Sequence, residues 1–410
     1  MSVLASSHPV ARALTWATVS ASLSKGVFFG VSVLFFTRVA GFTATTVGIG
    51  LTVAGGVAVG AALGAGYLAR VVGARRVLLA ATAGQGLALV AYLVVRTPAE
   101  FVAVASAAVG QQAMQRTALS TMIAESFTGP DRVEVRARLR VVTNVCIGLG
   151  TALAAAALAI GTRSAYLVAM LVTAALLFVS AFSLRGAPDA ARPGGAAGSP
   201  PGRRRSPLLD RTYLAVTGLY AVMTMQFGLL TVGVPLWVAG RTQAPAATVA
   251  ALLALNTAIV SLLQVWAARG ATDLRSAGRA VARAGALLGL ACGLYAGATG
   301  TAPVVAVAAL TLATVAHSLA EVLGEAGAWT LAFELADPAD AGAYQGVSQT
   351  GMALGSMLAP LVVTATAIEH GPAGWAVLGA LFVLAGLATP ALVRRHDRAQ
   401  EAGSSPSRWA

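Results

Sequence analysis

Charged residues are scarce in this sequence. Only 10% of its 410 residues are Asp, Glu, Lys or Arg, whereas 57% are hydrophobic. Soluble domains usually carry about 25% charged residues, so the chain lacks the charged shell that so large a hydrophobic core needs in water. Lipid is therefore the predicted solvent. The net charge of +13 does not indicate nucleic-acid binding, because the arginines cluster at the ends of apolar stretches.

Cysteine, histidine and lysine are scarce too. The two cysteines, Cys146 and Cys292, lie in apolar stretches of different halves and have neither metal-ligand nor disulfide spacing. Four histidines, three of them near span ends, loops or termini, do not suggest a metal site. The single lysine does not belong to a phosphate-binding loop, which argues against a nucleotide-driven pump. We expect no metal, no cofactor and no enzymatic activity.

A polar stretch divides the chain. Residues 185–211 are rich in Pro, Gly and Arg, a composition typical of a flexible linker. We predict an N-terminal six-helix bundle at 1–184, a C-terminal six-helix bundle at 212–393 and a cytoplasmic tail at 394–410. The linker between the bundles is expected to be cytoplasmic.

Each half contains six apolar stretches of about the 20 residues that an α-helix needs to cross ~30 Å of hydrocarbon. The predicted fold class is an all-α membrane protein with twelve transmembrane helices in two pseudo-symmetric bundles. The spans are expected at 14–37, 46–69, 77–95, 100–124, 141–160, 165–184, 213–239, 246–267, 280–299, 303–333, 346–368 and 374–393.

The distribution of arginine predicts the orientation. With a cytoplasmic N-terminus, twenty-two basic residues fall in inner segments and four in outer loops, in agreement with the positive-inside rule. Both termini are then cytoplasmic. The preference for Arg over Lys and the high Ala content indicate a GC-rich bacterial genome. We therefore expect a multi-pass protein of the bacterial inner membrane.

Two cations fall inside predicted spans, where a charge costs at least about 2.5–3.5 kcal/mol unless protein, water or a ligand surrounds it. Lys25 lies in the first span and Arg116 in the fourth. Gln112 and Gln115 lie close to Arg116 in the sequence. These four residues are candidates for the lining of a polar cavity that binds substrate.

The tenth span carries three further ionisable residues. His317, Glu321 and Glu325 follow one another at intervals of four, which places them on one face of a helix. Polar contacts between helices are the alternative role. Because a medium of low dielectric constant favours the neutral form of a carboxyl group, Glu321 is the first candidate for a proton carrier. Glu325 is the second, and His317 would tune or relay the proton.

The two halves show weak internal symmetry. An offset of 209 residues places Gln112 on Glu321 and Arg116 on Glu325, as in parallel repeats about an axis normal to the membrane. We hypothesise that these pairs face each other across a central cavity. Further candidate cavity residues, each with ordinary packing as the alternative, are Phe28, Tyr220, Gln226, Asn256 and Trp329.

The connection after the second span, from Gly66 to Arg76, reads G-Y-L-A-R-V-V-G-A-R-R. It resembles the cytoplasmic signature G-x-L-A-D-R-x-G-R-R of the major facilitator superfamily, and the chain as a whole resembles bacterial 12-helix drug/proton antiporters of that family. Arg70 stands where the family usually has Asp, so we expect Arg70 or Arg75 to pair with Glu125. The residues expected at a cytoplasmic gate are Gly66, Arg70, Gly73, Arg75, Arg76 and Glu125.

The resemblance implies a secondary active transporter that works by alternating access. With the buried carboxyl groups, it predicts proton-coupled efflux of small amphipathic compounds. The expected partners are a small-molecule substrate, protons and the lipid bilayer, without nucleic acid, and we expect a monomer. A proton symporter that takes up a small nutrient or metabolite, and a non-transporting membrane sensor, stay open as alternatives.

Overall fold

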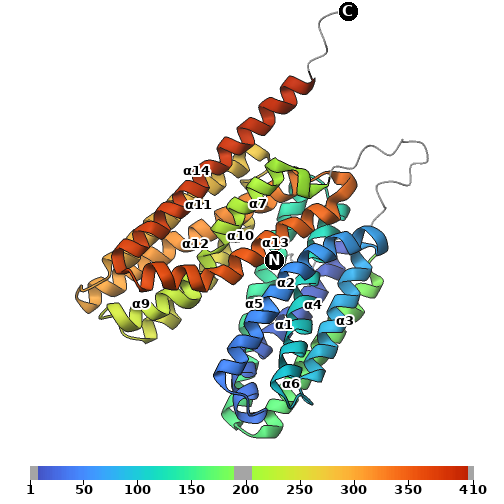
Figure 1. Cartoon of the computed structure of the whole chain (residues 1–410), viewed down its shortest axis with the longest axis vertical. Coiled ribbons are helices and arrows are strands. Elements are labelled where there is room, and N and C mark those ends of the chain that lie inside the picture. Colours follow the sequence, from blue (N-terminus) through green and yellow to red (C-terminus); the bar gives the residue numbers. More distant parts are fainter. Residues whose placement is uncertain (1–7, 189–205, 405–410) are drawn as a thin grey trace, which may run out of the picture. The chain divides into compact units, whose positions relative to one another are not determined.

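The computed structural model of the chain describes residues 8–188 and 206–404. All regular structure within these ranges is helical (Figure 1). A backbone in lipid has to satisfy its hydrogen bonds internally, and helices do so within one segment. Residues 189–205, which make up most of the predicted linker, lie outside the described residues.

Within the described residues, the first half of the chain forms six long helices. They are α1 Pro9–Leu34, continued by a π-helical turn at Phe35–Val39, α2 Ala44–Val72, α3 Ala74–Ala91, α4 Pro98–Ser126, α5 Pro130–Ile160 and α6 Arg163–Ser183. Thr43, Thr97 and Thr162 cap α2, α4 and α6 by accepting hydrogen bonds from backbone N–H groups of the first turn. Gly73, with a φ of 94°, makes the tight turn between α2 and α3.

The second half is built in the same way. Its helices are α7 Arg211–Thr224, α8 Gln226–Gly228, a π-helical turn at Leu229–Gly233, α9 Val234–Arg241, α10 Ala247–Arg269, α11 Leu274–Gly297, α12 Pro303–Glu334, α13 Ala341–Val363, a π-helical turn at Thr364–Ile368 and α14 Gly371–Ser404. The segment from α7 to α9 forms one apolar helical run, Arg211–Arg241. It covers the predicted span 213–239.

Nine helical segments among the described residues are long and apolar enough to cross a membrane. The predicted count of twelve spans is not confirmed. The expected spans outside these nine correspond to α1, α3 and α4. These helices carry Lys25, Gln85 and Arg116, and such polar side chains lower the mean hydropathy by which a spanning helix is recognised.

The helices group into two compact units. The first unit contains Met1–Arg204 and Ala336–Ala353, and the second contains Arg205–Leu335 and Leu354–Ala410. α13 is therefore divided between them, with its N-terminal part in the first unit. The predicted domains place all of α13 in the C-terminal bundle, and their limits stay a prediction.

Several helix pairings of the first unit recur in the second. α1 packs on α6 and α2 on α4, while α7 packs on α14 and α10 on α12. Close crossings depend on glycine: a Cβ on Gly26 would lie 2.2 Å from the carbonyl oxygen of Ile147 in α5. A Cβ on Gly355 in α13 would lie 2.2 Å from the carbonyl oxygen of Ala221 in α7. Small residues thus let backbones approach at one crossing in each unit.

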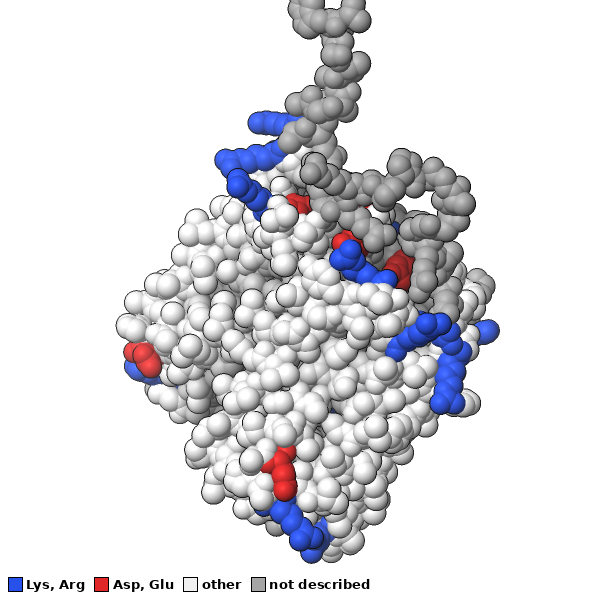
Figure 2. Space-filling model, turned by 45° about the vertical axis from the view of Figure 1, so that its right-hand side comes forward, with Lys and Arg blue, Asp and Glu red and all other residues white. Residues whose placement is uncertain are grey.

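Large apolar side chains are exposed on both units. Phe182 is 67% exposed in the first unit, and Leu262 and Trp266 are 78% and 65% exposed in the second. Figure 2 shows a face whose centre is a broad region free of charged side chains, while charged side chains lie towards its margins. Apolar surface of this extent marks contact with a membrane or a partner, and the long apolar helices identify it as lipid-facing.

Candidate transport site

A cavity of about 370 Å³ lies inside the first unit. Its polar lining comes chiefly from α1, α3 and α4, the helices that carry uncharged polar residues and cations in mid-span. Of the predicted cavity residues, those on its wall are Lys25, Phe28, Gln112, Gln115 and Arg116. The sequence therefore identified a set of residues that the fold brings together, and their role in transport stays a proposal.

The cavity contains two cations. Lys25 Nζ lies 5.3 Å from the ring centroid of Phe29, and Arg116 Nη1 donates a hydrogen bond of 3.3 Å to Gln112 Oε1. Among the described residues that line the cavity, none is Asp or Glu. The positive charge of this wall is therefore not balanced by a carboxylate of the same wall.

An amide pair fixes one side of the cavity. Gln115 Nε2 donates to Gln85 Oε1 at 2.7 Å and to the carbonyl oxygen of Ala81 at 3.2 Å, which ties α4 to α3. Sequence reasoning missed Gln85, as well as Phe36 and Tyr92, which line the same cavity. The signal was available for α3, because Gln85 and Tyr92 are seven residues apart and thus share a helix face.

The two buried carboxyl groups of α12, Glu321 and Glu325 (the acidic stripe), lie in the second unit. Glu321 and Glu325 are 4% and 2% exposed, so neither carboxyl group faces lipid. Tyr220 in α7 donates its hydroxyl to Glu325 Oε1 at 3.0 Å. Asn256 in α10 donates Nδ2 to Glu321 Oε2 at 3.0 Å and to Ser318 Oγ at 3.0 Å. Two neighbouring helices thus each supply one neutral donor to a carboxyl group of α12.

His317 is enclosed one turn before Glu321. It is 0% exposed, and neither ring nitrogen has a hydrogen-bond partner among the described residues. Its ring centroid lies 6.4 Å from that of Tyr295, whose hydroxyl is 3.3 Å from Thr314 Oγ1. An unpartnered buried polar group is costly, and this one lies on the same helix face as the two carboxyl groups.

Other predicted cavity residues also belong to the second unit. Tyr220 and Asn256 hold the α12 carboxyl groups, as described above, and do not line the cavity of the first unit. Gln226 and Trp329 are buried, at 2% and 5% exposure. The hypothesis that Gln112 and Arg116 face Glu321 and Glu325 across a central cavity stays a prediction.

Arg70, a residue of the predicted gate, forms an ion pair with a residue other than the expected Glu125. Arg70 Nε lies 2.9 Å from Asp340 Oδ1, and the Asp340 side chain is 1% exposed. Arg70 therefore pairs with Asp340, just before α13, and not with Glu125. The Arg70 alternative was wrong because the packing brings the start of α13 beside α2. The pairing of Arg75 with Glu125 stays a prediction.

Close backbone packing supports this arrangement. A Cβ on Gly66 would lie 2.4 Å from the carbonyl oxygen of Gly342, so only glycine allows α2 to approach α13 here. Arg75 donates Nε to the carbonyl oxygen of Leu184 at 3.1 Å and Nη2 to that of Arg185, which ties the α2–α3 turn to the end of α6. Arg76 is exposed.

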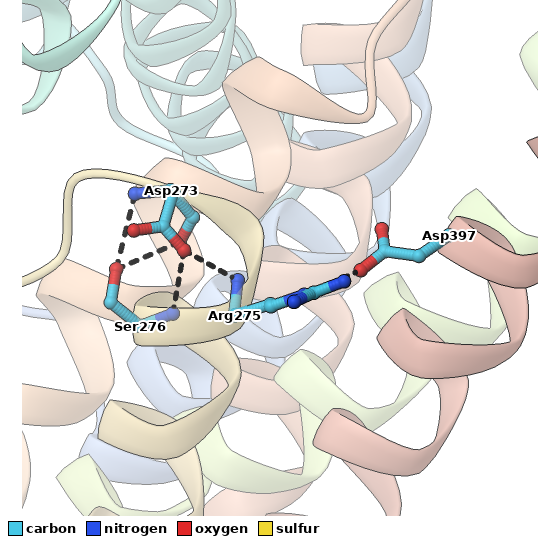
Figure 3. Close-up of polar contacts among 4 residues, drawn as sticks. All are labelled: Asp273, Arg275, Ser276 and Asp397. Atoms are coloured by element: carbon cyan, nitrogen blue, oxygen red, sulfur yellow. Dashed lines mark hydrogen bonds and ion pairs between the residues drawn. The ribbon is translucent and has the colours of Figure 1, made fainter. Parts of the chain in front are cut away.

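The α10–α11 connection in the second unit is held differently (Figure 3). Asp273 caps α11 by accepting hydrogen bonds of 2.9 Å from the backbone N–H groups of Ser276 and Arg275. These bonds, that of Ser276 first, hold the pKa of Asp273 below its ordinary value. Arg275 Nε lies 3.2 Å from Asp397 Oδ2 on α14. This turn is thus anchored within the second unit.

The sequence profile of the Major Facilitator Superfamily matches residues 14–360. The chain therefore belongs to this family, whose members are transporters of small molecules rather than enzymes, and the expected resemblance is confirmed at that level. A comparison with curated proteins gives no significant match.

Solved structures with the same fold come from transporters of different kinds. The human organic anion transporter TETRAN is 17% identical, with 93% of this chain and 99% of that chain covered and a TM-score of 0.68. The proton:xylose symporter XylE is 13% identical, with 94% and 95% covered and a TM-score of 0.69. A bacterial homologue of the iron transporter ferroportin, in an outward-facing state, is 12% identical, with 95% and 99% covered and a TM-score of 0.70. At these identities the similarity establishes the fold.

Proposed function

We propose that this chain is a proton-coupled secondary transporter of the bacterial inner membrane that exports small amphipathic compounds. It would work as a monomer with twelve spans, cytoplasmic termini and alternating access of its site to the two sides. The observation that carries the proposal is the pair of buried carboxyl groups one helical turn apart, Glu321 and Glu325, each held by a neutral donor.

The chemistry of this pair suits a proton carrier. A buried carboxyl group is stable in its neutral form because desolvation penalises the charge. Hydrogen bonds from Tyr220 and Asn256 stabilise the ionised form. A small change in hydration or in these bonds between transport states is then enough to release or take up a proton. Membership of a transporter family gives this proton a use as the driving ion.

The ion pair between Arg70 and Asp340 is proposed as part of the cytoplasmic gate. It reverses the usual polarity of the α2–α3 signature, because the cation lies in the last turn of α2 and the carboxylate lies just before α13. α13 contributes residues to both units. A bond at its N-terminal end is therefore placed to respond to movements of this helix during the transport cycle.

Proteoliposomes with an imposed pH gradient test the function. Three probes with one aromatic body and different charges are suitable: naphthalene-2-sulfonate, naphthalene-2-sulfonamide and (2-naphthylmethyl)trimethylammonium. For vesicles with an acidic interior, we expect the parent protein to accumulate at least one probe above its equilibrium level. Glu321→Gln and Glu325→Gln should each abolish accumulation. Both variants should still exchange the probe across the membrane when no pH gradient is imposed.

Glu334→Gln is the matched control, because Glu334 is an exposed residue at the end of the same helix. It should transport like the parent protein. Uphill transport by Glu321→Gln and Glu325→Gln equal to that of the parent would refute the coupling. Accumulation only with an acidic exterior would instead support the symport alternative, which the similarity of fold to XylE keeps open.

A further inference from the structure

We propose that the cavity of the first unit binds an organic anion, with the acidic group of the compound between Lys25 and Arg116 and its apolar part against an aromatic wall. This inference rests on the proposed function, because it names the class of compound that the transporter carries. It follows from the charge, the donors and the shape of the cavity.

The charge of the cavity calls for an anion. Neither Lys25 nor Arg116 forms an ion pair within the described residues of the first unit, and none of the described lining residues is acidic. Two cations in a membrane-embedded wall need a counter-charge or water. A ligand that brings its own negative charge supplies the counter-charge and gains charge-assisted hydrogen bonds.

The polar neighbours leave donors directed at such a ligand. Gln112 Oε1 accepts from Arg116 Nη1, which orients the guanidinium group and leaves the Gln112 amide nitrogen as a further donor. The planar guanidinium group binds carboxylate or sulfonate through two parallel hydrogen bonds, and the ammonium group of Lys25 adds a point charge. The amide of Gln115 is already occupied by Gln85 and Ala81.

The cavity is amphipathic along its length. Lys25 on α1 is followed by Phe28 one turn later and, in the π-helical turn that continues α1, by Phe36. All three line the cavity. Gln85 on α3 is followed seven residues later by the C-cap residue Tyr92, whose ring centroid lies 4.8 Å from that of Phe36. The cations and amides therefore lie at one depth and the aromatic rings at another.

The volume also fits a small organic compound. Ligand pockets usually measure about 300–1,000 Å³ and bury most of the surface of the ligand, and this cavity measures about 370 Å³. An inorganic anion would satisfy the cations and leave the aromatic wall uncovered. A compound with one acidic group on an aromatic or aliphatic body fills both parts.

Equilibrium dialysis with the full chain in lipid nanodiscs tests the inference without a pH gradient. We expect naphthalene-2-sulfonate to bind about tenfold or more tightly than naphthalene-2-sulfonamide, because only the anion makes charge-assisted hydrogen bonds. The trimethylammonium probe should bind more weakly still. Inorganic sulfate should compete about tenfold or more weakly than benzenesulfonate, because it cannot bury apolar surface.

Variants assign the preference to the two cations. Lys25→Met and Arg116→Met should each weaken sulfonate binding about tenfold or more and leave sulfonamide binding unchanged, while Lys25→Arg should retain most of the affinity for the sulfonate. Arg96→Gln is the matched control, because it removes one positive charge at an exposed position outside the cavity. Because the described cavity wall has no carboxylate, Lys25→Met leaves no buried acidic group of this wall without a partner. The thermal stability of this variant should therefore equal or exceed that of the parent.

The inference would be overturned if the three naphthalene probes bound equally, or if none of them bound at millimolar concentration. It would also be overturned if both methionine variants bound the sulfonate like the parent. Sulfate competing as well as benzenesulfonate would overturn its organic part. These outcomes are separate from those of the transport test. Selective sulfonate binding without gradient-driven transport refutes the proposed function alone, whereas driven transport of the cation alone refutes the anion inference alone.

Discussion

The two units carry ionisable side chains of opposite sign in the middle of predicted spans. The first unit presents Lys25 and Arg116 to a cavity whose described lining contains no carboxylate. In the second unit, Glu325 and Glu321 are buried and accept hydrogen bonds from Tyr220 and Asn256. Several helix pairings are nevertheless the same in both units. Similar packing therefore carries different chemistry, and we infer a division of work in which one unit binds substrate and the other carries protons.

The largest expected effect comes from substitutions at the close helix crossings of the two units. Gly26→Leu and Gly355→Leu place side chains where a Cβ already meets a carbonyl oxygen at 2.2 Å in each case. Overpacking costs about 1–3 kcal/mol or more, so both variants should lose monodisperse, folded protein in size-exclusion chromatography. Gly60→Leu is the control, because no atom lies within 4 Å of a Cβ there. Parent-like behaviour of both crossing variants would contradict a common packing scheme.

Variants of the hydrogen-bond donors to Glu325 and of the cavity amide Gln112 can distinguish proton coupling from substrate binding. Tyr220→Phe removes the hydroxyl that stabilises the ionised form of Glu325. A hydrogen bond to a charged group contributes about 1.5–3 kcal/mol, so gradient-driven accumulation of a probe should fall roughly tenfold while nanodisc binding stays unchanged. Gln112→Leu should do the reverse and weaken binding of the sulfonate probe. The comparison fails if both variants affect binding and driven transport in the same proportion.

The gate can be examined through its ion pair. Arg70→Ala removes the cation 2.9 Å from the buried carboxylate of Asp340 and should lower the free energy of unfolding by about 1–3 kcal/mol. The effect stays below that of a fully buried pair because the Arg70 side chain is 31% exposed. A thermal-shift comparison with Asp340→Asn and the double variant measures the coupling. Additive effects of the two changes would show that the pair does not act as a unit.

The smallest effect is expected at the turn that anchors α11. Asp273→Ala removes the helix cap and should cost about 1 kcal/mol. The backbone N–H groups of Ser276 and Arg275 lower the pKa of Asp273 in the folded state. Its contribution to stability is therefore present above the pKa of the unfolded chain and is lost as the pH falls through the folded-state pKa. Thermal scans at falling pH should converge for parent and variant; a constant difference would contradict this role of the cap.

The sequence was sufficient for the features that depend on composition and helical spacing. Positive charge inside predicted spans identified Lys25 and Arg116, and closeness in the sequence added Gln112. The interval of four aligned Glu321 with Glu325. The all-helical fold and the family followed from the apolar stretches and from the signature that begins at Gly66. Their outcome rests on periodicity, which a single sequence displays.

The rest depends on contacts between segments far apart in the sequence. Asp340 as the partner of Arg70, Gln85 as the partner of Gln115, and the donors to the α12 carboxyl groups are set by tertiary packing. The count of twelve spans was derived from hydropathy, and the helices outside the nine apolar segments are those with the polar cavity wall. The polar side chains that line the cavity also lower the mean hydropathy of the helices that carry them.

The most direct test of the central claim is the accumulation of naphthalene-2-sulfonate by proteoliposomes with an acidic interior, for the parent and for the double variant Glu321→Gln/Glu325→Gln. We predict that the parent concentrates the probe against its gradient and that the double variant brings it only to equilibrium. Equal uphill accumulation by both proteins would contradict the assignment of proton transport to the second unit.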